Sequence, residues 1–178
     1  MAKVTVFHGT TIERARKIIK DKTIKPTSSD IARYDDTTEG YVYVTKRFCD
    51  ALDFSTRPIA NENTLIFVVF KIMIEETELL YDDDEEKWIS TLSDDGATEC
   101  FRVQRELHFY DDVVAVFCKK MNSHNTIGNY MQAVQFGKIE VKESEWKNIC
   151  HDKLQINLKN GKQSVMPAST NSKQTRKS

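Results

Sequence analysis

The chain has 178 residues, of which 39% are hydrophobic and 30% charged, so it is long enough to bury the core of one soluble domain. Its formal net charge of −1 excludes the strongly basic overall field by which some proteins bind nucleic acid or anionic membranes. No apolar run approaches the roughly 20 residues that a membrane-spanning helix needs, and the N-terminus has no secretory leader pattern. We therefore expect a cytoplasmic protein that does not associate with membranes.

The first 26 residues predict a strand followed by a helix. Residues 3–8 have the pattern of a strand, and Thr10 or Thr11 is a suitable N-cap for a helix over residues 12–22. Apolar residues then recur at helical spacing, which gives this helix one buried face. They are Ile12, Ala15, Ile18 and Ile19.

A second strand and helix follow a polar loop. Residues 27–40 lack any apolar period, which indicates a loop. The segment "YVYVT" at 41–45 is β-branched and aromatic and predicts a short strand. Residues 46–55 predict a helix with Phe48 and Leu52 on its apolar side.

The second half of the chain is richer in strands. The apolar density of residues 64–74 predicts a central strand, and the acidic residues 75–88 predict a surface loop that runs into a short helix. Residues 100–110 and 113–120 predict two further strands joined by a turn at Asp111 and Asp112.

The C-terminal part is less determined. Two segments within residues 122–151, "NTIGNYMQAVQ" and "ESEWKNIC", could each form a helix. We expect a single domain over residues 1–157 and a basic, disordered tail over residues 158–178. The four cysteines are scattered with no C-x-x-C pair, so we expect reduced thiols and no metal site.

The order of these elements indicates an α+β fold. Strands cluster in the second half and do not alternate regularly with helices, which argues against a doubly wound sheet. Neither G-x-G-x-x-G nor G-x-x-x-x-G-K is present, so the usual nucleotide-binding fingerprints are absent from the sequence.

Four residues carry the candidate chemistry, although each also has a structural explanation. His8 ends the first strand and can be a hydrogen-bonded structural residue, whereas Tyr43 and Phe54 can be core aromatics. Glu106, with Gln104 before it, can belong to the solvent face of a half-exposed strand. Their order along the chain is more informative than any one of them.

That order resembles the ADP-ribosyltransferase superfamily, specifically its His-Tyr-Glu branch of poly-ADP-ribose polymerases and diphtheria-type toxins. The matching segments are "FHGTT", "ARKIIKDKTIKP", "GYVYVT" and "DALDF", with Glu106 on a later strand. The resemblance covers about residues 4–120, and it implies a split β-sandwich with N-terminal helices flanking a cleft for NAD. NAD would be a substrate, and no metal is implied.

The resemblance also implies roles for individual residues. His8 would bond the adenosine ribose of NAD, the backbone of Gly9 would hold the nicotinamide carboxamide, and Thr10 would add a hydroxyl nearby. Tyr43 and Phe54 would sandwich the nicotinamide ring, although the family usually has Tyr at the position of Phe54.

The expected catalytic acid is Glu106. It would bond the nicotinamide ribose and stabilise positive charge at the anomeric carbon, with His8 and Tyr43 completing the catalytic set. Gln104 stands two residues earlier, as in the Q-x-E pattern of other branches, and would help to choose the acceptor. Glu99 is the rival acid.

The resemblance implies a mono-ADP-ribosyltransferase that cleaves NAD and modifies a macromolecular acceptor, either a protein side chain or a nucleic acid. A toxin, an effector or a phage-conflict enzyme would fit this description, and NAD hydrolysis is a related outcome. Two alternatives remain open: an inactive module that binds NAD, ADP-ribose or a protein partner, and an enzyme that ADP-ribosylates a small-molecule drug.

Overall fold

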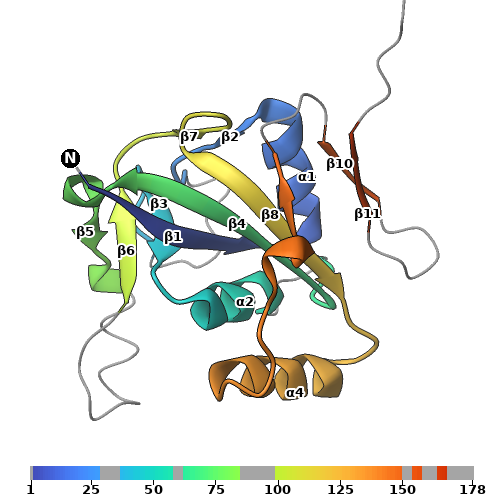
Figure 1. The fold of residues 1–178 in the computed structure, drawn as a ribbon. Helices are drawn as coiled ribbons and strands as arrows, with labels where there is room; N and C mark the ends of the chain where they lie inside the picture. The colour runs from blue at the N-terminus through green and yellow to red at the C-terminus, as the bar shows by residue number, and fades with distance from the viewer. Residues whose placement is uncertain are drawn as a thin grey trace, which may run out of the picture.

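The computed structural model describes residues 2–28, 37–57, 62–84 and 99–149, together with the backbone of two short strands at 154–157 and 164–167. Within these residues the fold is α+β, as the sequence predicts, with a mostly antiparallel sheet and three α-helices (Figure 1). The helices are α1 (Ile12–Asp21), α2 (Phe48–Thr56) and α4 (His124–Gln135).

The main sheet has seven strands in the order β5-β6-β3-β1-β4-β8-β9. Their bounds are β1 Lys3–Thr10, β3 Val42–Thr45, β4 Ile66–Glu75, β5 Leu80–Tyr81, β6 Cys100–Val103, β8 Val113–Lys120 and β9 Trp146–Asn148. Two small strands, β2 (Thr23–Ile24) and β7 (Leu107–His108), form a separate antiparallel pair.

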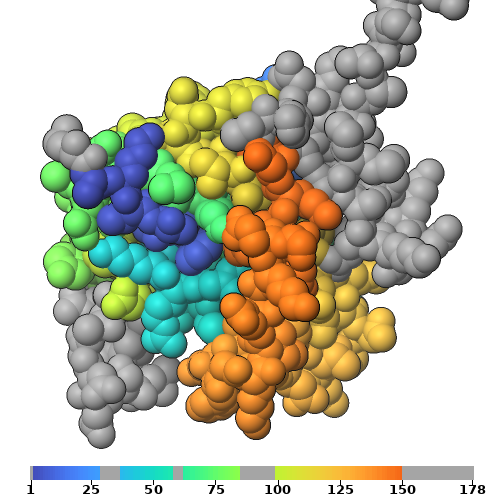
Figure 2. Space-filling model, viewed as in Figure 1, coloured from blue at the N-terminus to red at the C-terminus, as the bar shows by residue number. Residues whose placement is uncertain are grey.

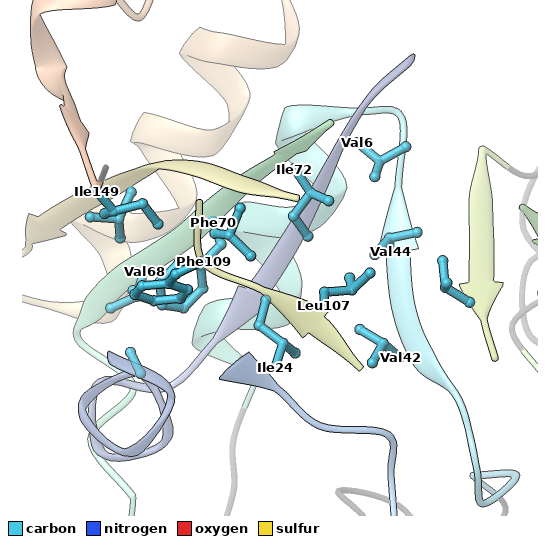
Figure 3. Close-up of a cluster of buried hydrophobic side chains, with 14 of the residues drawn as sticks. Val6, Ile24, Val42, Val44, Val68, Phe70, Ile72, Leu107, Phe109 and Ile149 are labelled. Atoms are coloured by element: carbon cyan, nitrogen blue, oxygen red, sulfur yellow. The ribbon is translucent and has the colours of Figure 1, made fainter. Parts of the chain in front are cut away.

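Both faces of the sheet are covered, which explains the continuous apolar run in its central strand. In β4, Phe70, Ile72 and their same-face neighbours pack with α1, β2 and β7 (Figure 3), whereas Phe67 and Val69, on the opposite face, pack with α2 and α4. A strand buried on both faces is apolar along most of its length. The prediction of a central strand over residues 64–74 is therefore confirmed.

An aromatic cluster closes the face that carries α2. Trp146 of β9 lies against Phe7 of β1 and Phe48 of α2, with ring centroids 5.8 and 5.3 Å away. Figure 2 shows the orange segment that follows α4 crossing this face beside β1 and α2. The segment that follows α4 thus packs against the beginning of the chain.

Strands β1 and β3 separate soon after they meet. In the described residues their register contains the pair Phe7 and Thr45, whereas β1 stays paired with β4 as far as Thr10 opposite Val68. The end of β1 and the beginning of β3 therefore lie apart at the middle of the sheet. This separation is the feature on which the candidate site depends.

Gly9 allows helix α2 to lie directly on β1. A Cβ added to Gly9 would stand 1.8 Å from the carbonyl oxygen of Ala51 in α2. That distance is far below a van der Waals contact, so only glycine fits between the strand and the helix. The family resemblance implies that glycine at position 9 lets the backbone approach nicotinamide. The structure shows in addition that glycine is needed there for α2 to pack on β1.

Two predicted elements differ from the structure. Residues 100–110 do not form one strand, because a bend at Gln104 and Arg105 separates β6 from β7. The segment "ESEWKNIC" is not a helix: it contains the 3-10 turn Glu143–Glu145 followed by β9. In both segments, pairing with strands distant in sequence determines the conformation. The periodicity of the local sequence therefore does not predict it.

The C-terminal part also contains regular structure. β10 (Leu154–Asn157) pairs with β11 (Ser164–Pro167), and β11 lies inside the range 158–178 for which composition predicts none. The remaining residues of the predicted tail lie outside the described part.

The described helices are short. The 12 residues of α4 make it longer than α1 or α2. In the described part of the chain no helix combines the length and the apolar character needed to cross a membrane.

Replacing Gly9 with alanine tests the packing of α2 on β1. We expect Gly9→Ala to lower the free energy of unfolding by about 3 kcal/mol, because the new methyl group overlaps backbone atoms that cannot rotate away. Urea denaturation measures the change. Gly128→Ala in α4 is the matched control: its Cβ would meet nothing within 4 Å, and the variant should gain about 0.5–1 kcal/mol. A Gly9→Ala protein as stable as the wild type would contradict the close packing.

Candidate functional site

A cleft of about 630 Å³ opens where β1 and β3 separate. Its size lies within the range usual for small-molecule sites. The end of β1, the start of β3, one side of α1 and the C-terminal end of α2 line it. The lining includes five residues that the sequence analysis singles out: His8, Gly9, Thr10, Tyr43 and Phe54.

His8 bridges the two strands at the point where their backbone pairing has ended. Its Nδ1 lies 2.8 Å from the carbonyl oxygen of Tyr43. A carbonyl oxygen only accepts, so Nδ1 carries the proton and donates. In the neutral imidazole the lone pair then resides on Nε2, which fixes the tautomer of His8.

Tyr43 is held through its hydroxyl group. The hydroxyl donates to Asp84 Oδ2 at 2.6 Å and lies 2.9 Å from the carbonyl oxygen of Thr38. Burial and the adjacent Asp84 carboxylate raise the pKa of Tyr43, so its hydroxyl stays protonated. The ring therefore occupies a fixed position at the edge of the cleft.

Asp84 connects Tyr43 to the segment before β3. Its carboxylate also accepts from the backbone N–H and the hydroxyl of Thr38, each at 3.0 Å. Burial alone would raise the pKa of Asp84, but the hydrogen bonds from Tyr43 and Thr38 outweigh it and lower the pKa. Asp84 is thus an anionic acceptor in the wall of the cleft.

Phe54 lies on α2 with a cation over its ring. The guanidinium carbon of Arg57 is 4.2 Å from the ring centroid, a cation–π contact. Arg57 also donates to Asp53 at 2.7 Å. Both Phe54 and Arg57 border the cleft.

The cleft carries charges of both signs. Its cationic side chains are Arg14, Lys17, Lys25 and Arg57, and its carboxylates are Glu13, Asp21, Glu62, Asp82 and Asp84. The Arg14 guanidinium pairs with Glu62 at 3.0 Å. A ligand with anionic and hydroxyl groups would find donors on the α1 side and acceptors at Asp82 and Asp84.

Glu106 does not belong to the residues that line this cleft. The sequence analysis places it in the middle of a strand, whereas it follows the bend and directly precedes β7. Because Ile24 pairs with Leu107, continuing that register by one residue would set Glu106 opposite Lys25, which does line the cleft. The backbone of Glu106 thus directly precedes Leu107, whose partner Ile24 lines the cleft.

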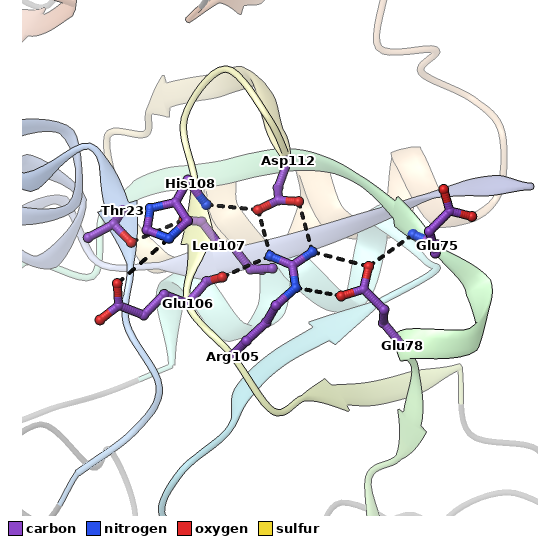
Figure 4. A network of polar contacts seen from close by, with 8 residues as sticks. All are labelled: Thr23, Glu75, Glu78, Arg105, Glu106, Leu107, His108 and Asp112. Carbon is purple, nitrogen blue, oxygen red and sulfur yellow. Dashed lines mark hydrogen bonds and ion pairs between the residues drawn. The ribbon is translucent and has the colours of Figure 1, made fainter. Parts of the chain in front are cut away.

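The side chain of Glu106 points away from the core. Leu107 is buried, and alternation turns the residues on either side of it outward. The Glu106 carboxylate is accordingly half-exposed and lies 3.8 Å from Nε2 of His108 (Figure 4).

Gln104, expected to recognise the acceptor, and Glu99, the rival catalytic acid, also lie outside the cleft lining. Gln104 is an exposed residue of the bend, so strand alternation does not orient it together with Glu106 as the sequence analysis assumes. Glu99 precedes β6, where its carbonyl oxygen accepts from the backbone of Lys46 at 2.9 Å.

The charged residues of the cleft wall were not predicted from the sequence, and Asp84 and Arg57 are two of them. Asp84 belongs to the acidic stretch that composition assigns to a surface loop, and no local pattern distinguishes it from its neighbours. Arg57 stands one residue past the end of α2. Its spacing of three from Phe54 is a signal, since residues three apart on a helix are neighbours.

In the residues that the structure describes, no group of three or more His, Cys, Asp or Glu side chains lies close enough to hold an ion.

Removing the Tyr43 hydroxyl tests the link between Tyr43 and Asp84. We expect the pKa of Asp84 to be higher in Tyr43→Phe than in the wild type, because a hydrogen bond that stabilises the carboxylate is lost. Carboxyl-detected NMR titration measures the shift. Tyr41→Phe, whose ring lies under Arg102, is the control and should leave Asp84 unchanged. An unchanged pKa in Tyr43→Phe would refute the link.

Comparison with known proteins does not assign the chain to a family. No protein-family model matches the sequence. Searches of curated proteins and of solved structures likewise gave no significant match. The interpretation of the cleft therefore depends on its own geometry and on the motifs in the sequence.

Proposed function

We propose that this protein is a mono-ADP-ribosyltransferase that uses NAD as its substrate. One observation carries the proposal: His8, Gly9, Thr10, Tyr43 and Phe54, chosen from sequence motifs, border a single cleft although they come from three separate elements. Three of the five are consecutive residues at the end of β1, and Tyr43 and Phe54 reach the same cleft from β3 and α2.

The separation of β1 from β3 supports the finer fold assignment. β2 and β7 lie as a second small sheet on the face of the main sheet that carries Val42 and Val44, and Ile24 and Leu107 pack against it (Figure 3). Two sheets with a cleft at the separation of central strands are what a split β-sandwich of the ADP-ribosyltransferase type requires.

The cleft suits the chemical groups of NAD. The Nε2 lone pair of His8 is an acceptor for a ribose hydroxyl, and the Tyr43 and Phe54 rings are surfaces for the nicotinamide ring. Arg14 and Lys17 on α1 supply positive charge for the diphosphate. Each role follows from an atom on the cleft wall.

The proposed reaction exchanges one bond at the anomeric carbon of the nicotinamide ribose. The bond from this carbon to the nicotinamide nitrogen breaks, and its electron pair neutralises the pyridinium. A lone pair of the acceptor forms the new bond, and the acceptor loses its proton to Glu106 or to water. Positive charge grows on the ribose in between, and a carboxylate there stabilises it.

A binding module without turnover is the second candidate, and one observation favours it. Glu106 is outside the cleft lining, and its carboxylate is half-exposed beside His108. In this case the cleft would bind NAD or ADP-ribose through His8 and Tyr43 without cleaving it. Turnover and binding are separable by experiment.

The decisive experiment follows NAD labelled on its adenylate phosphate. The full chain is incubated with labelled NAD and a cell lysate, nicotinamide release is measured, and label is traced into protein, RNA, DNA or free ADP-ribose. We expect label in one macromolecular fraction, and we expect Glu106→Ala to reduce nicotinamide release by about 100-fold or more, as for loss of an electrostatic catalyst. Glu99→Gln should remain active.

The other outcomes separate the candidates. NAD binding by calorimetry without nicotinamide release, weakened in His8→Ala, would support the binding module. Equal release by wild type and Glu106→Ala would remove Glu106 from the mechanism. Label found only in free ADP-ribose would indicate NAD hydrolysis.

A further inference from the structure

The position of Glu106 is determined by its backbone more than by contacts of its side chain. Its side chain is 48% exposed, and the nearby His108 Nε2, 3.8 Å from Oε2, is beyond hydrogen-bonding distance. The direction of this side chain therefore follows from how the backbone of residues 106–108 is held.

Arg105 holds that backbone on its N-terminal side. Its guanidinium donates to the carbonyl oxygen of Glu106 at 2.9 Å. The same guanidinium forms bidentate bonds with two carboxylates: Asp112 at 2.7 and 2.9 Å, and Glu78, whose Oε1 lies at 3.1 Å and whose Oε2 accepts from Nε (Figure 4). A planar guanidinium with donors fixed in a fork is suited to this arrangement.

Asp112 holds the backbone on the other side of Glu106. Its Oδ2 accepts from the backbone N–H of His108 at 2.9 Å, and its own N–H donates to the carbonyl oxygen of His108 at 3.0 Å. The Asp112 carbonyl oxygen accepts from Met73 of β4 at 2.8 Å. The segment around Glu106 is thus tied to the central strand of the sheet.

Glu78 provides the second anchor. It ends the 3-10 turn η1 (Glu76–Glu78), which directly follows β4, and its carboxylate also accepts from the backbone N–H of Glu75 at 3.3 Å. Arg105 therefore connects the bend before β7, the turn before β8 and the end of β4. The pKa of Glu78 is lowered first by its hydrogen bond from Arg105, and the same guanidinium lowers that of Asp112 against the opposing effect of burial.

Arg105, Asp112 and Glu78 do not belong to the residues that line the cleft. They are thus suited to act on the site through Glu106 and not on NAD itself. We propose that Arg105, clamped by Asp112 and Glu78, is a positioning residue that fixes the backbone of Glu106 and so sets the direction of the carboxylate that the proposed reaction uses. The effect of Arg105 on catalysis rests on the proposed reaction with NAD; its effect on the backbone of Glu106 does not.

Arg105→Lys is the test, because lysine keeps the charge and loses the planar fork. With NAD as the varied substrate, we expect kcat to fall by about 100-fold, the size typical of a misplaced catalytic group, and KM for NAD to stay within about twofold. Glu78→Gln, which leaves the Asp112 half intact, should give a smaller loss. Arg16→Lys, on the exposed side of α1 and outside the cleft lining, is the matched control.

A double-mutant comparison separates positioning from stability. In a Glu106→Gln background, Arg105→Lys should lower kcat by less than about threefold, because the group it positions has already been disabled. Assays run well below the melting temperature of each variant. A 100-fold loss in both backgrounds would mean that Arg105 acts independently of Glu106, and a raised KM with unchanged kcat would mean that it contacts NAD; either result overturns the inference.

The claim that Arg105 orders the backbone of Glu106 can be tested without an activity assay. Backbone ¹⁵N relaxation should give Glu106 an order parameter of about 0.85 in the wild type and below about 0.6 in Arg105→Lys, with no change in Arg16→Lys. An unchanged value in Arg105→Lys would overturn the clamp even if NAD is cleaved. Loss of order in a protein that does not consume NAD would refute the proposed function and leave the clamp intact.

Discussion

The contact between Gly9 and the carbonyl oxygen of Ala51 is the constraint on which the rest of the structure depends. It lets α2 lie against β1 at the level where β3 moves away from that strand. The cleft occupies the resulting space, and α2 supplies Phe54 and Arg57 to its wall. A side chain at position 9 would push the helix and this wall outward together.

The polar groups exposed by the strand separation are satisfied by side chains. His8 donates to the Tyr43 carbonyl oxygen, which a continued ladder would have paired with backbone, and Tyr43 in turn donates to Asp84. Buried or half-buried backbone groups need such partners. The residues that border the cleft therefore have structural roles as well as the proposed chemical ones.

Charge is distributed differently in the cleft and in the clamp. In the clamp, one guanidinium meets two carboxylates at close range, an arrangement that fixes geometry. In the cleft, cations and carboxylates from α1 and from several other segments line an open space. The first arrangement holds a backbone segment, and the second leaves charges at the surface where a ligand could meet them.

The apolar pattern of consecutive residues predicted the helices and strands that bury one or both faces in the core. It determined β1, α1, β4 and β8 and the α+β class, because apolar periodicity appears in consecutive residues. The set from His8 to Phe54 was proposed from the resemblance of motifs to a known family. Tertiary structure alone decided the bend at Arg105, the outward direction of Glu106 and the recruitment of Asp84, Glu78 and Asp112. These depend on pairings between segments distant in sequence, and such pairings leave no periodicity in the residues that form them.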